Sequence, residues 1–140
     1  MSVAIVQSRM CNVKDLLDRS PVAGVAQAEQ LLRYWLRSSN EVWMGMYDGQ
    51  VACVWGLRTP TILSDRPYLW LFTTDLVEQH KFLFIRRSQL VVEEILERYP
   101  LIVGHVSLWN HAARKWLKWL GAEFGPPEEQ GAPFVIRRKE

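Results

Sequence analysis

The sequence predicts an α/β (α+β) fold, in which a mixed, mostly antiparallel sheet of about six or seven strands is flanked by about four helices. Asp48-Gly49 between two apolar runs predicts an antiparallel hairpin. A helical pattern separates the apolar stretches 68–73 and 101–108, so these strands are expected to be parallel through a right-handed crossover. The chain has 140 residues and no repeat or linker, which indicates a single domain over 1–140.

The first half of the chain mixes apolar runs with one clear amphipathic pattern. The predicted elements are strand 3–7, a short helix from Asn12 or Lys14 to Asp18, helix 25–36, and the hairpin strands 42–47 and 50–57. Apolar residues recur at helical spacing from Ala28 to Leu36, and Ser38-Ser39-Asn40 closes that helix. Ser20-Pro21 and Gly24 separate the two helices.

The second half predicts the remaining elements in the order that the crossover requires. They are a loop over 59–67, strand 68–73, a long helix 78–98, strand 101–108, a helix opened by Asn110, a short strand 122–124 and a last strand 134–138. Strand 68–73 is continuously apolar, which is typical of a central strand. Tyr99-Pro100 ends the long helix.

Composition excludes several classes of function. The net charge is +2, from 17 basic and 15 acidic residues, which is too weak to indicate a nucleic-acid partner. The basic residues near Trp116 and Trp119 are better explained as a solvated helix face than as a stacking platform for single strands. No apolar run approaches the ~20 residues of a membrane span, and no charged region is followed by an apolar h-region, so we expect a soluble, intracellular protein.

The residues that commonly bind metals are scattered. His80, His105 and His111 have no ligand spacing, so no metal site is expected. Cys11 and Cys53 lie far apart and match no redox motif, which indicates free buried thiols in a reducing compartment. Most of the seven tryptophans are expected in the core.

The stretch from Asn110 to Phe124 combines a helix start, an amphipathic helix and a stop. Asn110 is a good N-cap, and Gly121 stands where a positive φ is expected. With Ala113 and Trp116 between them, these residues resemble the Asn-x-x-Ala-x-x-aromatic-x-x-x-x-Gly-Phe pattern of the GNAT family of N-acetyltransferases. The final Phe of that pattern is replaced by Ala122.

The resemblance implies a fold and a place for the ligand. In the GNAT family the fourth and fifth strands splay apart and the pantetheine of acetyl-CoA lies between them, at the carboxyl ends of strands. The implied site is bounded here by 71–74 and 106–110. The candidate cofactor-binding residues are Phe72, Thr73, Thr74 and Asn110.

Two departures from the family pattern argue against acetyl transfer. The family binds the pyrophosphate with a Gln/Arg-x-x-Gly-x-Gly/Ala loop, whereas no glycine occurs between Gly56 and Gly104 here. Asp75 and Glu78 place negative charge in that region, which four cations compensate only in part: His80, Lys81, Arg86 and Arg87. The tyrosine that protonates the leaving thiolate in many members corresponds to Leu117.

The catalytic residues therefore stay unassigned. His111 is a possible substitute acid, but it is better explained as a solvated residue at a helix start. Glu41 and Asp48 are possible general bases, but no sequence pattern supports either one. No cofactor is expected, and acetyl-CoA would be one only if the chain is an active enzyme.

A narrower resemblance concerns small GNAT-like proteins of short-tailed bacteriophages, some of which are internal virion proteins. It is carried by Leu-Phe-Thr-Thr-Asp at 71–75, by Leu-Trp-Asn at 108–110 and by 120–124. It implies a noncatalytic virion or assembly component, located in the cytoplasm of a bacterial host and in the virion. The alternatives are an active N-acetyltransferase that uses acetyl-CoA and an amine, and a noncatalytic binder of acyl-CoA.

One helical segment has more apolar residues than a single buried face requires. Phe82 to Ile85 are four in a row inside the predicted long helix. We therefore expect contacts with other virion or assembly proteins, or self-association, through Phe82, Phe84, Trp116 and Trp119.

Overall fold

The computed structural model describes residues 3–20, 27–59, 66–108 and 110–139. Its sheet has seven strands in the order β1-β2-β3-β4-β5-β7-β6. The strands are β1 Val3–Gln7, β2 Glu41–Tyr47, β3 Gln50–Arg58, β4 Tyr68–Thr73, β5 Leu101–Val106, β6 Glu123–Phe124 and β7 Ala132–Arg137. The helices are α1 Val13–Asp18, α2 Ala28–Ser38, α3 Asp75–Gln79, α4 Lys81–Arg98 and α5 His111–Trp119. The predicted α/β class with a mixed, mostly antiparallel sheet is confirmed.

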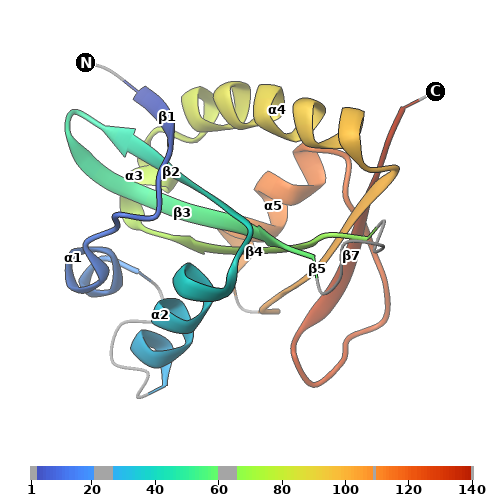
Figure 1. The fold of residues 1–140 in the computed structure, drawn as a ribbon, viewed down its shortest axis with the longest axis horizontal. Coiled ribbons are helices and arrows are strands. Elements are labelled where there is room, and N and C mark those ends of the chain that lie inside the picture. The colour runs from blue at the N-terminus through green and yellow to red at the C-terminus, as the bar shows by residue number, and fades with distance from the viewer. Residues whose placement is uncertain (1–2, 21–26, 60–65, 109, 140) are drawn as a thin grey trace.

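Helices cover both faces of this sheet (Figure 1). Leu16 of α1 and Leu32 of α2 belong to a hydrophobic cluster with Trp70 of β4. Phe84 of α4 and Trp116 of α5 belong to a second cluster on the other face. Successive residues of a strand point to opposite faces, so the central strands contribute to both clusters.

The hairpin forms where the sequence predicts it. Asp48 has φ 47° and Gly49 has φ 83°. Positive φ at both central residues is the signature of a type I′ turn, whose twist matches that of the flanking strands. β2 and β3 are antiparallel neighbours, with a register shift between Gly45 and Met46.

β4 and β5 are parallel and separate early. Only two residue pairs join them, Tyr68 with Val103 and Leu69 with Gly104. β4 continues to Thr73 and β5 to Val106 without further pairing to each other. The predicted splay of the fourth and fifth strands is thus present.

The prediction of one long helix over 78–98 is wrong in one respect. The segment forms two helices, α3 and α4, which are separated at His80. The ring of His80 stacks on that of Tyr47 with 3.8 Å between centroids and 13° between planes. This contact accompanies a break in helical geometry at His80, so that the described residues form five helices rather than about four.

Other boundaries differ by a few residues. The fifth strand ends at Val106 rather than Leu108, and the last strand begins at Ala132 because Ala132 pairs with Val106. The start of helix 25–36 and most of the loop 59–67 lie outside the described residues, as do Pro21, Gly24 and Trp109. No helix in the described part of the chain is long and apolar enough to cross a membrane.

Candidate functional site

A cavity of about 530 Å³ opens where β4 and β5 part. Its lining comes from α2, β4, β5, the start of α5 and the segment before β7, and consists of Ser20, Gln27, Ala28, Leu31, Trp35, Tyr68, Trp70, Leu71, Phe72, Thr73, His105, Val106, Ser107, Asn110, Ala113 and Gln130. We call it the cleft cavity. Its volume is in the ~300–1,000 Å³ range of ligand pockets.

Three of the four predicted cofactor-binding residues line the cleft cavity: Phe72, Thr73 and Asn110. Thr74 does not line it. The Thr74 hydroxyl donates to the carbonyl oxygen of Ala52 at 2.6 Å and accepts from the Leu76 amide at 3.3 Å. Thr74 therefore caps α3 and ties it to β3.

Asn110 has the capping role that the sequence predicts. Its side-chain oxygen accepts a hydrogen bond from the amide of Ala113 at 3.1 Å. Gly121, just past the end of α5, has φ 97°, a conformation that favours glycine. The motif that opens α5 thus also places an amide side chain at the edge of the cleft cavity.

A chain of three polar side chains stands at the wall of the cleft cavity. The Tyr68 oxygen and His105 Nδ1 are 3.0 Å apart, and His105 Nε2 is 2.7 Å from a carboxylate oxygen of Glu128. With the ring neutral and its Nε2–H donated to Glu128, Nδ1 accepts the Tyr68 O–H. Burial raises the pKa of the Tyr68 phenol, which keeps that donor protonated. The chain can hold or move a proton beside the cavity.

The sequence predicted no role for Tyr68, His105 and Glu128 together. They belong to β4, to β5 and to the segment before β7, so no local motif joins them. It is the parallel register of the folded sheet that brings Tyr68 and His105 together. Tyr68 pairs with Val103, and His105 lies two residues further along, on the same face of the sheet.

Aromatic rings stiffen the α2 side of the cleft cavity. Trp35 stacks on Tyr68 with 5.5 Å between centroids and 5° between planes. Trp35 also stacks on Trp70 at 6.0 Å, and the Arg58 guanidinium lies 5.6 Å from the Trp35 ring centroid. Stacked rings hold one another in place, so this wall is preorganised.

The region expected to hold coenzyme A phosphates is much more confined. A recess of about 100 Å³ lies between the starts of α4 and α5, and Glu78, Lys81, His111 and Lys115 are among its lining residues. Asp75 at the start of α3 is paired with Arg19 at 3.1 Å. The amide of Leu76 is already bonded to Thr74.

The interior between β4, α4 and α5 is filled. Trp116 is 5% exposed, and its indole N–H donates to the Ser88 hydroxyl at 2.9 Å. The free space beside it is about 20 Å³, and Leu117 is one of its walls. Leu117 is buried and carries no proton to donate, as the sequence suggested.

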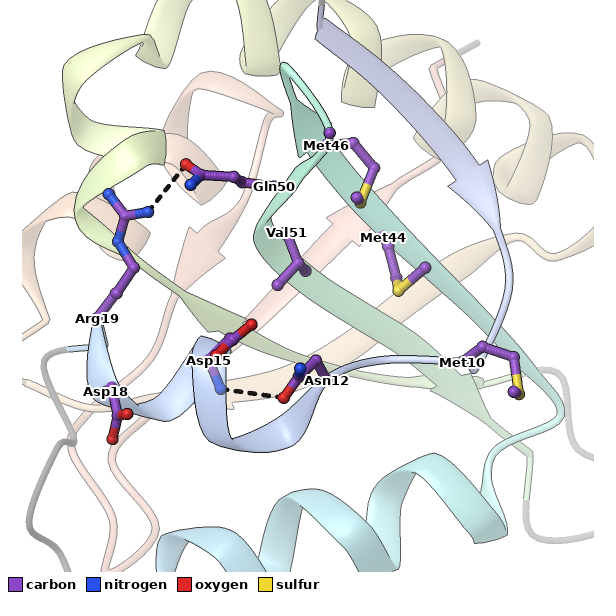
Figure 2. A pocket seen from close by; sticks show the side chains of 10 residues that line it. Met10, Asn12, Asp15, Asp18, Arg19, Met44, Met46, Gln50 and Val51 are labelled. Atoms are coloured by element: carbon purple, nitrogen blue, oxygen red, sulfur yellow. Dashed lines mark hydrogen bonds between the residues drawn. The ribbon is translucent and has the colours of Figure 1, made fainter.

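A separate cavity of about 600 Å³ lies beneath α1 (Figure 2). Met44 and Met46 of β2 line it, opposite the carboxylates of Asp15 and Asp18. At its edge Arg19 donates to the side-chain oxygen of Gln50 at 3.1 Å. None of the sequence-predicted site residues lies in this cavity.

The residues predicted to contact partners fall into two groups. Phe82 is 66% exposed and Trp119 is 60% exposed. Phe84 and Trp116 are in the core, with 0% and 5% exposure, so the expectation that they contact a partner is wrong. Both point inward because they lie on the helix faces that pack against the sheet.

Cysteines and metal-binding groups offer no further site. Cys53 is buried and Cys11 is half-buried, and both are free. Within residues 3–20, 27–59, 66–108 and 110–139, no three His, Cys, Asp or Glu side chains come together as a possible metal site.

Solved structures resemble this chain over nearly its whole length. No family model and no curated protein sequence matches it. The ribosomal-protein-S18-alanine N-acetyltransferase of Escherichia coli superposes with a TM-score of 0.71 at 14% identity, over 99% of this chain and 96% of that one. A GNAT-family acetyltransferase from Staphylococcus aureus Mu50 gives 0.69 at 11% identity, over 99% and 100%.

A third neighbour was solved with coenzyme A. It is the PaiA N-acetyltransferase of Thermoplasma acidophilum, with a TM-score of 0.66 at 12% identity, over 98% of this chain and 99% of that one. Likeness at such low identity establishes the fold alone, and none of these comparisons bears on the bacteriophage resemblance. The seven-stranded sheet, the parting of β4 and β5 and these neighbours together show that the chain has the GNAT acyl-CoA N-acyltransferase fold.

Proposed function

We propose that this chain is a GNAT-fold protein that has lost acetyl transfer and serves as a noncatalytic component of a bacteriophage virion or of its assembly. The observation that carries the loss of catalysis is the confined phosphate region at the start of α4. The recess there is about 100 Å³, compared with about 530 Å³ for the cleft cavity.

Chemistry in that region supports the same conclusion. Glu78 faces the recess beside Lys81 and Lys115, so its carboxylate offsets part of the positive charge that a pyrophosphate would meet there. Lys81 and Leu83 stand at the start of α4, where a glycine would let the backbone approach an anion. Arg19 is engaged by Asp75 and Gln50.

Calorimetric titration of the full chain with acetyl-CoA tests the loss of cofactor binding. We expect no saturable heat up to millimolar ligand. The matched variant is Asn110→Asp, because aspartate also caps a helix but adds a negative charge at the cleft cavity. Micromolar binding by the unaltered chain that weakens in Asn110→Asp would overturn the proposal.

The particle role rests on the resemblance carried by 71–75, 108–110 and 120–124. Its test is quantitative mass spectrometry of purified virions of the source phage. A structural component is expected at a fixed copy number that persists after density-gradient purification. Absence of the chain from such particles would contradict a virion role.

An acetyl-CoA-dependent N-acetyltransferase is the second candidate, and the Tyr68–His105–Glu128 chain favours it. In that reaction the nitrogen of an amine bonds to the acetyl carbon and the carbon–sulfur bond breaks. The amine would lose its proton to the Tyr68 oxygen as the Tyr68 O–H passes its own proton to His105 Nδ1, 3.0 Å away. The imidazole would then return that proton through Tyr68 to the thiolate, and the Glu128 carboxylate would stabilise the protonated imidazole in between.

The two candidates differ in a turnover assay with a panel of amines. An enzyme is expected to release free thiol from acetyl-CoA, and His105→Gln should reduce that rate by about 100-fold or more. Binding of acetyl-CoA without turnover would instead indicate a noncatalytic acyl-CoA binder. The first candidate predicts neither binding nor turnover.

A further inference from the structure

The outward face of α4 lies along the edge of the molecule (Figure 1). The inward face is buried through Phe84, Ile85, Ser88, Val92, Ile95 and Leu96. On the outward face Phe82 is 66% exposed, Leu83 is 49% exposed and Leu90 is 66% exposed. Large apolar side chains on an open helix face are typical of a surface that another helix covers.

Four of the charges on this face flank Leu90 symmetrically, and a fifth, Glu97, lies seven residues after Leu90, at the position that mirrors Leu83. Arg86 and Arg87 precede Leu90 by four and three residues, and Glu93 and Glu94 follow it by three and four. All four charged side chains are exposed. Residues three and four apart are neighbours on a helix surface, so Leu90 lies between a basic pair and an acidic pair.

Among the described residues, none of these four side chains forms a salt bridge within 4 Å. Glu94 interacts electrostatically with Arg98, four residues later, and Glu93 lines a cavity that Arg137 and Arg138 also line. The basic and acidic pairs are seven residues apart, so they are not i,i+4 partners of each other. By contrast, Arg98 at the end of α4 is bonded twice to Glu41, at 2.9 and 3.0 Å.

We propose that α4 is a homodimer interface in which two copies pack antiparallel about a two-fold axis at Leu90. That axis brings Leu90 onto Leu90 of the second copy. It also places Arg86 and Arg87 opposite Glu94 and Glu93 of the second copy, and the reverse. A two-fold interface must be self-complementary in this way, with residue i meeting j and j meeting i.

The order of the charges along α4 favours a second copy of this chain as the partner, and it favours an antiparallel arrangement of the two helices. A parallel arrangement would place Arg86 and Arg87 against the same arginines, which is repulsive. α4 has 18 residues and is therefore about 27 Å long, so two such helices form a small interface. The dimer is expected to be of micromolar affinity and to weaken as salt rises. This inference does not depend on the proposed function.

Charge reversal tests the interface by sedimentation equilibrium of the full chain. Arg86→Glu with Arg87→Glu makes both pairs acidic, and Glu93→Arg with Glu94→Arg makes both pairs basic. Each double variant is expected to raise the dimer dissociation constant by roughly tenfold or more, because like charges then face each other. An equimolar mixture of the two is expected to form a heterodimer, and the fourfold variant carrying all four changes is expected to dimerise again.

The matched control is Lys14→Glu with Arg37→Glu on α1 and α2, which makes the same change in net charge as the first double variant at exposed positions on the other face of the sheet. It should dimerise like the unaltered chain, and circular dichroism should show all variants folded. A chain that stays monomeric at millimolar concentration would overturn the proposal. So would double variants that dimerise as well as the unaltered chain, or a fourfold variant that does not recover.

Discussion

Gly104 controls how closely β4 and β5 approach before they part. A Cβ atom there would lie 2.5 Å from the carbonyl oxygen of Leu69 and 2.5 Å from the ring of Phe134. An added methyl group would meet backbone on one side and the buried ring of Phe134, which is 1% exposed, on the other. Neither neighbour can move away to make room for it. Because glycine carries only a hydrogen atom where other residues carry Cβ, Gly104 can pair with Leu69, which is the last pair of the parallel ladder.

We expect Gly104→Ala to destabilise the fold by about 1–3 kcal/mol, the cost of overpacking a filled site. Urea unfolding followed by circular dichroism measures the change. Gly49→Asn is the comparison, because a Cβ at Gly49 meets nothing within 4 Å and asparagine tolerates a positive φ. Equal midpoints for the two variants would contradict this account of Gly104.

The two thiols should respond to pH through their burial. Burial raises the pKa of Cys11 to about 11, and it also raises the pKa of Cys53, which is fully buried. At pH 8 both are protonated, so iodoacetamide should label the native chain slowly, with a rate for Cys11 that rises about tenfold per pH unit below 11. In Cys11→Ser, labelling should require unfolding. Native labelling as fast as that of free cysteine would contradict the prediction.

The same shift affects stability at high pH. An unfolded thiol loses its proton near its ordinary value of 9.0, whereas folded Cys11 keeps the proton to about pH 11. The unfolded state then binds fewer protons than the folded state, so the free energy of unfolding falls as pH rises through this window.

At the scale of elements, one buried hydrogen bond joins α4 to α5. The Trp116 indole N–H donates to the Ser88 hydroxyl at 2.9 Å, and the two residues are 5% and 2% exposed. Ser88 also donates to the carbonyl oxygen of Ile85 at 3.1 Å, which fixes its rotamer. The bond orients Trp116 against Trp55, with the rings edge to face at 5.9 Å.

We expect Ser88→Ala to cost about 1–3 kcal/mol, because it leaves a buried indole N–H without an acceptor. Trp116→Phe removes the donor as well as part of the ring. In a double-mutant cycle by urea unfolding, the combined variant should be less destabilised than the sum of the two, by about 1 kcal/mol. Strict additivity would mean that the bond contributes nothing.

The elements also show where sequence reasoning succeeds and where it ends. The hairpin, the Asn110 cap and the parallel pair each have a local or periodic signal, and all three are present. The break at His80 has no such signal, since it depends on a ring stacked against Tyr47, 33 positions earlier in the chain. His105 likewise acquires its partners from two other segments, which only the register of the folded sheet brings together.

At the scale of the whole molecule, the two hydrophobic clusters share one sheet. Val54 and Trp70 belong to the cluster under α1 and α2, while Cys53 and Leu69, their neighbours in sequence, belong to the cluster under α4 and α5. Because the two clusters share these strands, unfolding of the strands exposes both clusters to water at once. The molecule should therefore unfold as one unit.

Thermal or urea unfolding should give coincident transitions by tryptophan fluorescence and by far-ultraviolet circular dichroism. Trp119→Phe is the control, because Trp119 is 60% exposed and its replacement should alter the signal but not the midpoint. Two separated transitions would show that the faces of the sheet unfold independently.

We expect the two residue pairs between β4 and β5 to act as a pivot between the two halves of the sheet. Thr73 lies four residues beyond Leu69, which is about 13 Å along the strand at about 3.3 Å per residue. With a lever arm of that length, a rotation of about 5° between the two halves of the sheet moves Thr73 by about 1 Å. The opening between β4 and β5 can thus widen or narrow to fit a bound molecule, while the pairing of β4 with β3 and of β5 with β7 keeps its register.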